Sequence, residues 1–308
     1  MTNCVLLFAG QGAQKVGMGQ DLMEASPIAS DLFAQADEVL GRKLSEILFA
    51  GPEEELTKTA NCQPALFVHG LAMWAILKDA CPDLNPVAAA GLSLGEMTAH
   101  TAAGSFSFEE GLRVVAQRGK LMDEACAETE GAMAAMVGGD EAAVRELAAE
   151  ADVDVANLNA PGQIVLSGTV AGIDQAVAGA KARKIKLAKK LKVAGAYHSR
   201  LMANAEAKLG PVLAEAQIQS PKFPVVSNYR AEAVTDPAAI RETLQKQVTG
   251  SVRWVESMQL LRSEGNELFI ELGPGKVLAG LMPRIDKGAT IETAGDWASL
   301  EALIEKLK

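Results

Sequence analysis

Ser93 has the surroundings of a catalytic nucleophile, because it lies in the pentapeptide Gly91-Leu92-Ser93-Leu94-Gly95. An apolar run over residues 86–92 leads into it, and a stretch with helical spacing over 94–103 follows. A sharp strand-to-helix turn needs neighbours without a Cβ and leaves the hydroxyl exposed at the helix N-terminus. Unpaired backbone N–H groups there can hold a developing oxyanion. The alternative is an ordinary glycine-rich loop, in a chain with 28 glycines.

A nucleophilic serine needs a base, and the chain offers 3 histidines. His100 lies on the same predicted helix as Ser93, roughly 10 Å further along its axis, so it cannot reach the hydroxyl. His69 falls inside an apolar helical stretch, where we expect a core histidine. His198 follows a predicted strand and precedes a predicted helix, and we interpret it as the general base. The alternative is that His198 caps this helix.

Arg118 lies on a predicted helix that begins at a capping box, Ser107 with Glu110 three positions later, and runs to about Ala125. Its neighbours three and four positions away are all apolar: Val114, Val115, Leu121 and Met122. An unpaired, partly buried guanidinium is costly, so Arg118 must find an anion elsewhere. Either a distant carboxylate supplies it or a substrate does, since a planar guanidinium can bind a carboxylate through two parallel hydrogen bonds.

These residues need a framework, and short apolar runs alternate with helical patterns along the chain. The periodicity predicts buried strands at residues 4–9, 87–92, 223–227 and 267–272, and helices that include 32–40, beginning at Ser30, and 64–77. Strands that alternate with helices predict an α/β fold with a mostly parallel sheet.

The middle of the chain has a different order of elements. We expect strands at residues 132–137, 153–157, 163–166 and 185–193, with helices at 141–150 and 170–182. The resulting order, βαββαβ, is that of a ferredoxin-like unit. We therefore expect a small subdomain over residues 129–195, inserted into a large α/β subdomain that comprises 1–128 and 196–308.

Composition limits the classes of partner. A net charge of −10 and a pI near 5.0 disfavour nucleic acid or an anionic membrane, which would require a clustered positive field. No apolar run approaches the roughly 20 residues that cross a bilayer, and no secretory signal is apparent. The 4 cysteines have no metal-ligand spacing. We expect a cytoplasmic protein without a metal site.

Eight ordered motifs carry a resemblance to a known family. The chain resembles malonyl-CoA:acyl-carrier-protein transacylases over essentially its whole length in FAGQG (8–12), QPA (63–65), GLSLGE (91–96), QRG (117–119), NAPGQ (159–163), YHS (197–199), VRW (252–254, with Gln247 ahead of it) and ELGPG (271–275). The family has a hydrolase-like large subdomain and a ferredoxin-like small one, with the active site between them.

The resemblance implies a role for each candidate residue. Ser93 would be acylated, His198 would be the base, and Arg118 would bind the malonyl carboxylate. The backbone carbonyl of Gln247 would orient the histidine. The backbone N–H groups of Leu94 and Gln11 would hold the oxyanion.

One departure concerns the position before the nucleophile. The family commonly has histidine there, where this chain has Leu92. A residue at that point of a tight turn need not touch the proton being moved, so we expect activity to survive.

The implied function is transfer of a malonyl group from malonyl-CoA to the phosphopantetheine thiol of acyl carrier protein in fatty-acid biosynthesis. We expect a monomer that uses the coenzyme A thioester as substrate and no cofactor. A serine hydrolase or thioesterase remains an alternative, as does a non-catalytic scaffold that binds the carrier. Seven cations between Lys181 and Lys192 either steer the carrier towards the site or form a solvated face.

Overall fold

The strand predicted at residues 4–9 forms the centre of the larger sheet. The computed structural model, which describes residues 1–308, places β1 (Thr2–Phe8) between β2 (Leu84–Gly91) and β9 (Leu268–Leu272), with parallel pairing on both sides. The sheet order is β10-β9-β1-β2-β7-β8, and only the β7–β8 pair is antiparallel. The remaining strands are β7 (Val225–Val226), β8 (Ala233–Val234) and β10 (Thr290–Ala294). The mostly parallel α/β sheet is confirmed.

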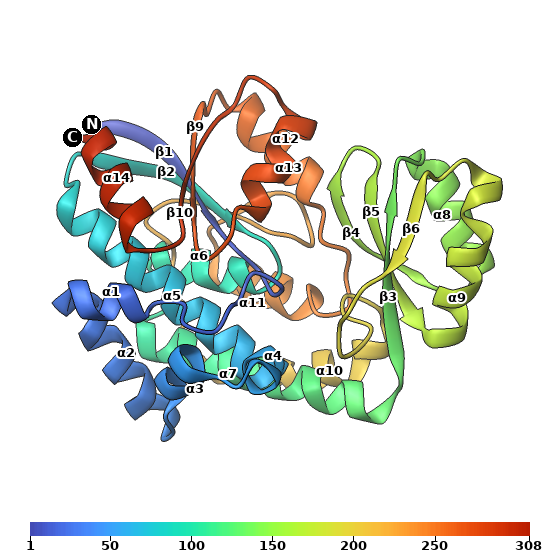
Figure 1. Cartoon of the computed structure of the whole chain (residues 1–308), viewed down its shortest axis with the longest axis horizontal. Helices are drawn as coiled ribbons and strands as arrows, with labels where there is room; N and C mark the ends of the chain where they lie inside the picture. The colour runs from blue at the N-terminus through green and yellow to red at the C-terminus, as the bar shows by residue number, and fades with distance from the viewer.

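Helices cover both faces of this sheet, which explains why its central strand is a continuous apolar run. Cys4, Leu6 and Phe8 belong to the larger core, whereas Val5 and Leu7 belong to a second core with residues of α12 (Trp254–Ser263) and α13 (Val277–Ile285). Figure 1 shows the helices on the two sides of the sheet. The helices of this lobe are α1 (Gln20–Ala25), α2 (Pro27–Leu40), α3 (Leu44–Ala50), α4 (Glu53–Thr57), α5 (Thr59–Ala80), α6 (Leu94–Ala102), α7 (Phe108–Glu128), the short 3-10 turn Arg200–Met202, α10 (Ala203–Glu215), α11 (Pro237–Lys246), α12 (Trp254–Ser263), α13 (Val277–Ile285) and α14 (Trp297–Leu307).

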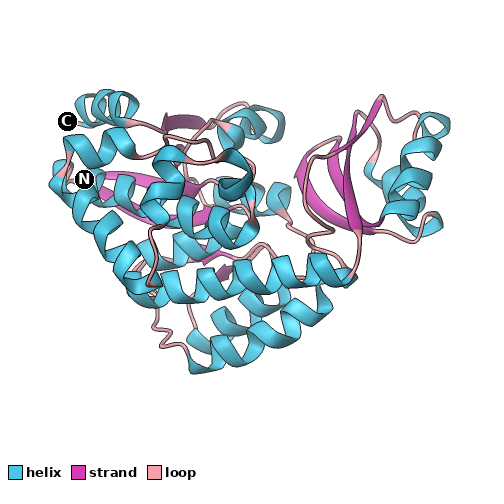
Figure 2. Cartoon of the chain, turned by 60° about the horizontal axis from the view of Figure 1, so that its bottom comes forward, coloured by secondary structure: helices cyan, strands magenta, loops and turns pink.

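The middle of the chain forms a separate lobe with its own sheet and core, seen to the right in Figure 2. Its elements follow the predicted βαββαβ order: β3 (Gly131–Val137), α8 (Glu141–Glu150), β4 (Asp154–Ala160), β5 (Gln163–Thr169), α9 (Val170–Gly179) with the 3-10 turn Lys181–Arg183, and β6 (Leu187–Lys190). The sheet order β4-β5-β3-β6 with antiparallel pairing is the ferredoxin-like arrangement. The boundaries at 128/129 and 195/196 stay a prediction.

Two predicted helix starts are wrong, and proline explains both. α2 begins at Pro27, four residues before the Asp31 start that Ser30 would cap, because the fixed φ of proline suits the first helical turn. α5 begins at Thr59 and contains Pro64. Proline there leaves the carbonyl of Ala60 without its helical donor, and the guanidinium of Arg42 donates to this oxygen at 3.1 Å.

Two strands are shorter than predicted, because the residues at their ends form turns. β6 covers only Leu187–Lys190, since the chain before it forms a turn with Lys184 in the left-handed region (φ 59°). β7 is reduced to Val225–Val226. The residues that follow β7 turn towards the Ser93 region, where Asn228 hydrogen-bonds to the backbone.

The tight packing of the β2–α6 turn gives a stability prediction. A Cβ on Gly91 would lie 2.0 Å from backbone atoms of Gly95, so Gly91→Ala should lower the free energy of unfolding by about 3 kcal/mol. Gly280→Ala is the matched control: nothing lies within 4 Å of its added Cβ inside α13, and stability should rise by about 0.5–1 kcal/mol. Urea unfolding measures both. Equal effects of the two substitutions would contradict the tight turn.

Candidate active site

Ser93 lies at the turn between β2 and α6 with φ 55° and ψ −106°, a backbone conformation that side chains rarely adopt. Glycines on either side permit it. Besides the clash at Gly91, a Cβ on Gly95 would lie 2.2 Å from the carbonyl oxygen of Phe8. The structure therefore has the sharp strand-to-helix turn that the pentapeptide predicts and no open glycine-rich loop at this place.

His198 lies within hydrogen-bonding distance of this serine. Its Nε2 is 2.8 Å from Ser93 Oγ, and its Nδ1 is 2.8 Å from the backbone oxygen of Gln247. A carbonyl can only accept, so Nδ1 carries the proton and Nε2 presents its lone pair to the serine hydroxyl. Burial, with a further contribution from the Arg118 charge, lowers the pKa of His198 to about 4. The imidazole is therefore a neutral acceptor at neutral pH.

Arg118 is buried, with 1% of its surface exposed, and makes no ion pair within 4.0 Å. Its guanidinium donates to three neutral oxygens: Gln63 Oε1 at 2.5 Å, Gln247 Oε1 at 2.8 Å and Ser93 Oγ at 3.1 Å. Its Nε has no partner. Of the two alternatives, no distant carboxylate contacts Arg118, because amide oxygens occupy those positions, although the Glu96 charge acts on it from beyond the Gln247 amide. Burial lowers the pKa of Arg118 only to about 10, so the charge persists.

The two residues expected to hold the oxyanion come from the β2–α6 turn and from the loop after β1. Leu94 is the first residue of α6, so its N–H has no acceptor within the helix. Gln11 lines the same cavity as Ser93. The loop that carries it is held against the turn, since a Cβ on Gly10 would lie 2.4 Å from the carbonyl oxygen of Leu92.

A cavity of about 260 Å³ opens above the serine and histidine and is lined by both lobes. The large lobe contributes Gln11, Leu92, Met122 and Val277, and the small lobe contributes Met133, Asn157 and the 191–194 segment. Leu92 gives this wall an apolar surface. The cavity can therefore hold a small acyl group with the serine at one end.

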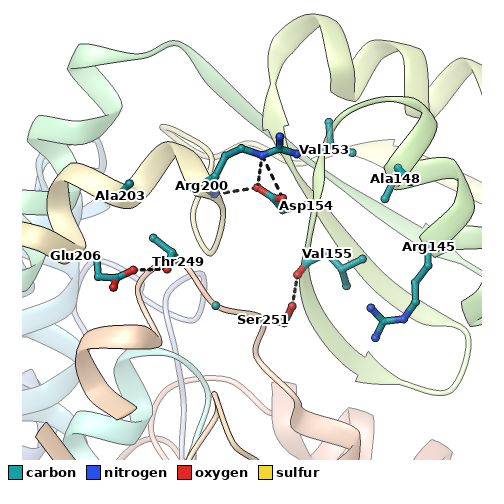
Figure 3. A pocket seen from close by; sticks show the side chains of 12 residues that line it. Arg145, Ala148, Val153, Asp154, Val155, Arg200, Ala203, Glu206, Thr249 and Ser251 are labelled. Carbon is teal, nitrogen blue, oxygen red and sulfur yellow. Dashed lines mark hydrogen bonds and ion pairs between the residues drawn. The ribbon is translucent and has the colours of Figure 1, made fainter. Parts of the chain in front are cut away.

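The base is anchored to the small lobe. Asp154, at the start of β4, accepts the backbone N–H of Arg200 at 2.8 Å and also pairs with its guanidinium. Figure 3 shows this contact at the edge of a second pocket. This pocket has a volume of about 620 Å³, and neither Ser93 nor His198 lines it. In the same view Ser251 donates to the carbonyl of Val155 at 2.5 Å. The segment that carries His198 and the segment whose Gln247 carbonyl accepts from the imidazole are therefore both held by β4, an edge strand of the small-lobe sheet.

Sequence reasoning missed three polar groups of the site. Asn228 Oδ1 accepts the backbone N–H of Ser93 at 2.6 Å, and its Nδ2 donates to Gly91 O at 2.8 Å, which holds the turn in shape. Gln63 and the side chain of Gln247 hold Arg118. The residues beside these three amides do not distinguish them from surface amides.

The other histidines lie apart from the reacting groups. His69 is fully buried with neither ring nitrogen bonded, as expected of a core histidine. His100 Nδ1 contacts Ser105 Oγ at 3.1 Å. No three His, Cys, Asp or Glu side chains lie close enough to bind a metal ion, and no helix is both long and apolar enough to span a membrane.

An α/β sheet that presents a serine at a strand-to-helix turn, beside a neutral imidazole and a guanidinium that contacts no carboxylate, defines a class of enzymes that move acyl groups through a serine. The family described as acyl transferase domain has a model that matches residues 5–296. The chain belongs to this acyl transferase family.

Individual relatives match along their whole length. The chain is 42% identical to malonyl CoA-acyl carrier protein transacylase of Bacillus subtilis (strain 168), over 100% of this chain and 98% of that protein. An acyl-carrier-protein-S-malonyltransferase from Bartonella henselae has a similar structure, with TM-score 0.94 and 37% identity over 100% of this chain and 99% of that one. A malonyl-transacylase solved in complex with a type II PKS acyl-carrier protein gives TM-score 0.93 and 37% identity over 99% and 100% of the two chains.

The low pKa of His198 predicts the pH dependence of serine reactivity. Labelling of Ser93 by a sulfonyl fluoride should stay constant as the pH falls through about 6.5, where an unperturbed imidazole protonates, and decline only towards about 4. Arg118→Met should move this inflection upward, because the positive charge contributes to the lowered pKa. Intact-protein mass spectrometry follows the label, with Ser93→Ala as the unlabelled control. An inflection near 6.5 in the unaltered protein would contradict a buried, neutral base.

Proposed function

We propose that the protein transfers a malonyl group from malonyl-CoA to the phosphopantetheine thiol of acyl carrier protein, in fatty-acid biosynthesis, through a malonyl-serine intermediate. The observation that carries the proposal is the buried Arg118, which keeps its charge, has no ion-pair partner and lies 3.1 Å from Ser93 Oγ. A carboxylate on the far end of a short acyl group supplies the missing anion. The names of the relatives support the same donor and acceptor.

The first half of the reaction acylates the serine. Ser93 Oγ attacks the thioester carbonyl carbon while its proton passes to Nε2 of His198. The N–H groups of Leu94 and Gln11 stabilise the resulting oxyanion. The carbon–sulfur bond then breaks, coenzyme A leaves with the proton from His198, and the malonyl ester remains on Ser93.

The second half regenerates the serine. The carrier thiol gives its proton to His198, and its sulfur attacks the ester carbonyl. When the carbon–oxygen bond breaks, Ser93 takes the proton back and the malonyl group remains on the carrier. The Gln247 carbonyl keeps Nδ1 protonated throughout, so the same nitrogen, Nε2, exchanges the proton in both halves.

A thioesterase would use Ser93 and His198 in the same way, but it has no need for the buried cation. A non-catalytic scaffold has no need for the serine, the histidine or the cation.

The basic run between Lys181 and Lys192 contributes to carrier binding in our proposal. Lys190 and Arg183 are paired with Asp174 and Glu150, whereas Lys192 lines the cavity.

Mixing the protein with malonyl-CoA tests the intermediate directly. Intact-protein mass spectrometry should show one malonyl adduct, which Ser93→Ala abolishes, and adding acyl carrier protein with its phosphopantetheine arm should remove the adduct and load the carrier. Rapid loss of the adduct without carrier would support a thioesterase instead. Absence of any adduct would support a scaffold.

Arg118 should determine the preference for a malonyl donor. Arg118→Ala removes a buried charge partner, which costs at least about 2 kcal/mol, so kcat/KM for malonyl-CoA should fall roughly 30-fold or more relative to acetyl-CoA. Steady-state transfer with both donors measures the ratio. Equal losses for both donors would remove Arg118 from the specificity role, since acetyl has no carboxylate to bind.

A further inference from the structure

A fully buried carboxylate lies directly behind the reacting groups. Glu96 is on the first turn of α6, and its Oε2 accepts from Gln247 Nε2 at 2.6 Å and from the backbone N–H of Asn228 at 2.9 Å. Both partners also touch Ser93. Gln247 Nε2 donates to the Ser93 carbonyl at 3.0 Å, and Asn228 Oδ1 accepts the Ser93 N–H. Glu96 thus joins the turn that carries the serine to the segment that orients the base.

The amide of Gln247 can face its surroundings in only one way, and Glu96 is one of the groups that fix it. Its oxygen accepts from Arg118 at 2.8 Å, and its nitrogen donates to Glu96. A guanidinium can only donate, whereas Glu96 Oε2 and the Ser93 carbonyl both accept, so a reversed amide would lose these contacts. The two ends of an amide have almost the same shape, and packing alone would not choose between them.

The charges around Glu96 are few. Burial raises its pKa to about 7, while the bonds from Asn228 and Gln247 and the Arg118 charge act in the opposite direction. His100 Nε2 lies 4.0 Å from Oε1, and neither atom has a hydrogen-bond partner. Burial lowers the pKa of His100 to about 3, so that ring is neutral. Arg118 and Glu96 therefore contact opposite ends of the Gln247 amide and do not contact each other directly.

We propose that Glu96 is a positioning residue that acts through the side chain of Gln247. By fixing this amide, it keeps the amide oxygen on Arg118 and the Gln247 backbone on His198, so that the acyl-binding cation and the base hold one arrangement. This inference rests on the proposed function of the site. It assigns a role to a residue that touches neither the serine hydroxyl nor the imidazole.

A double-mutant cycle tests whether Glu96 acts through Gln247. The rate of malonyl-serine formation is measured by rapid quench and mass spectrometry for Glu96→Ala, Gln247→Ala and the double variant, normalised to the folded fraction. Gln247→Ala keeps the backbone carbonyl that His198 needs. Each single change should slow acylation roughly ten- to a hundredfold, and the double variant should be no slower than Gln247→Ala alone. Multiplying losses would overturn the proposal.

Glu96→Gln separates position from charge. Its amide oxygen can accept both bonds of Oε2, and its NH2 group faces the unpartnered His100 Nε2, so the rate should stay within about threefold of the unaltered protein. A loss as large as that of Glu96→Ala would overturn a positioning role. Asp37→Ala is the matched control, because Asp37 is a buried carboxylate that accepts two hydrogen bonds from Ser45, in a helix that does not line the cavity. It should lower stability without changing acylation.

The unaltered protein distinguishes failure of the proposed function from failure of the role of Glu96. If it forms no malonyl-serine, the proposed function fails whatever the variants do. If it acylates normally and Glu96→Ala acylates equally fast, the function stands and the role of Glu96 is refuted.

Discussion

The site depends on a guanidinium that is buried without an anion of its own. Hydrogen bonds to three neutral oxygens hold the guanidinium of Arg118 but supply no countercharge in contact with it, and in a medium of low dielectric this charge attracts an incoming carboxylate strongly. The acceptors come from three separate parts of the large lobe: Gln63 on α5, Ser93 after β2 and Gln247 after α11. A carboxylate in place of Gln63 would neutralise the cation and remove its attraction for a substrate.

Ser93 and His198 are held in place by different lobes. The parallel sheet fixes Ser93, because β2 lies beside β1 and the turn packs against the end of that strand. The imidazole belongs to the segment that returns from the small lobe, and Asp154 and Val155 of β4 hold that segment and its neighbour in place. A ferredoxin-like unit with no reacting residue of its own thereby contributes to the geometry of the base.

Local signals in the sequence predicted the elements and the reacting residues. Glycine spacing indicated the turn at Ser93, apolar periodicity indicated the parallel sheet and the βαββαβ insert, and the apolar neighbours of Arg118 indicated a cation without a helical partner. The supporting amides could not be found this way. Gln247 meets Arg118 across 129 positions and Asn228 meets Ser93 across 135, and nothing in the residues beside either amide distinguishes a site residue from a surface one.

The partner of the imidazole also limits the kinds of bond this protein can exchange. In the hydrolytic triads that cleave amides, a carboxylate stabilises the imidazolium that forms during attack. Here the partner is an uncharged peptide oxygen, and Arg118 opposes a positive ring. The imidazolium is therefore less stabilised than it would be beside a carboxylate, and it readily gives up the proton on Nε2, to the departing sulfur in one half of the reaction and to Ser93 Oγ in the other. Exchange between thioesters, whose sulfur leaving groups depart easily, tolerates such a weakly stabilised imidazolium.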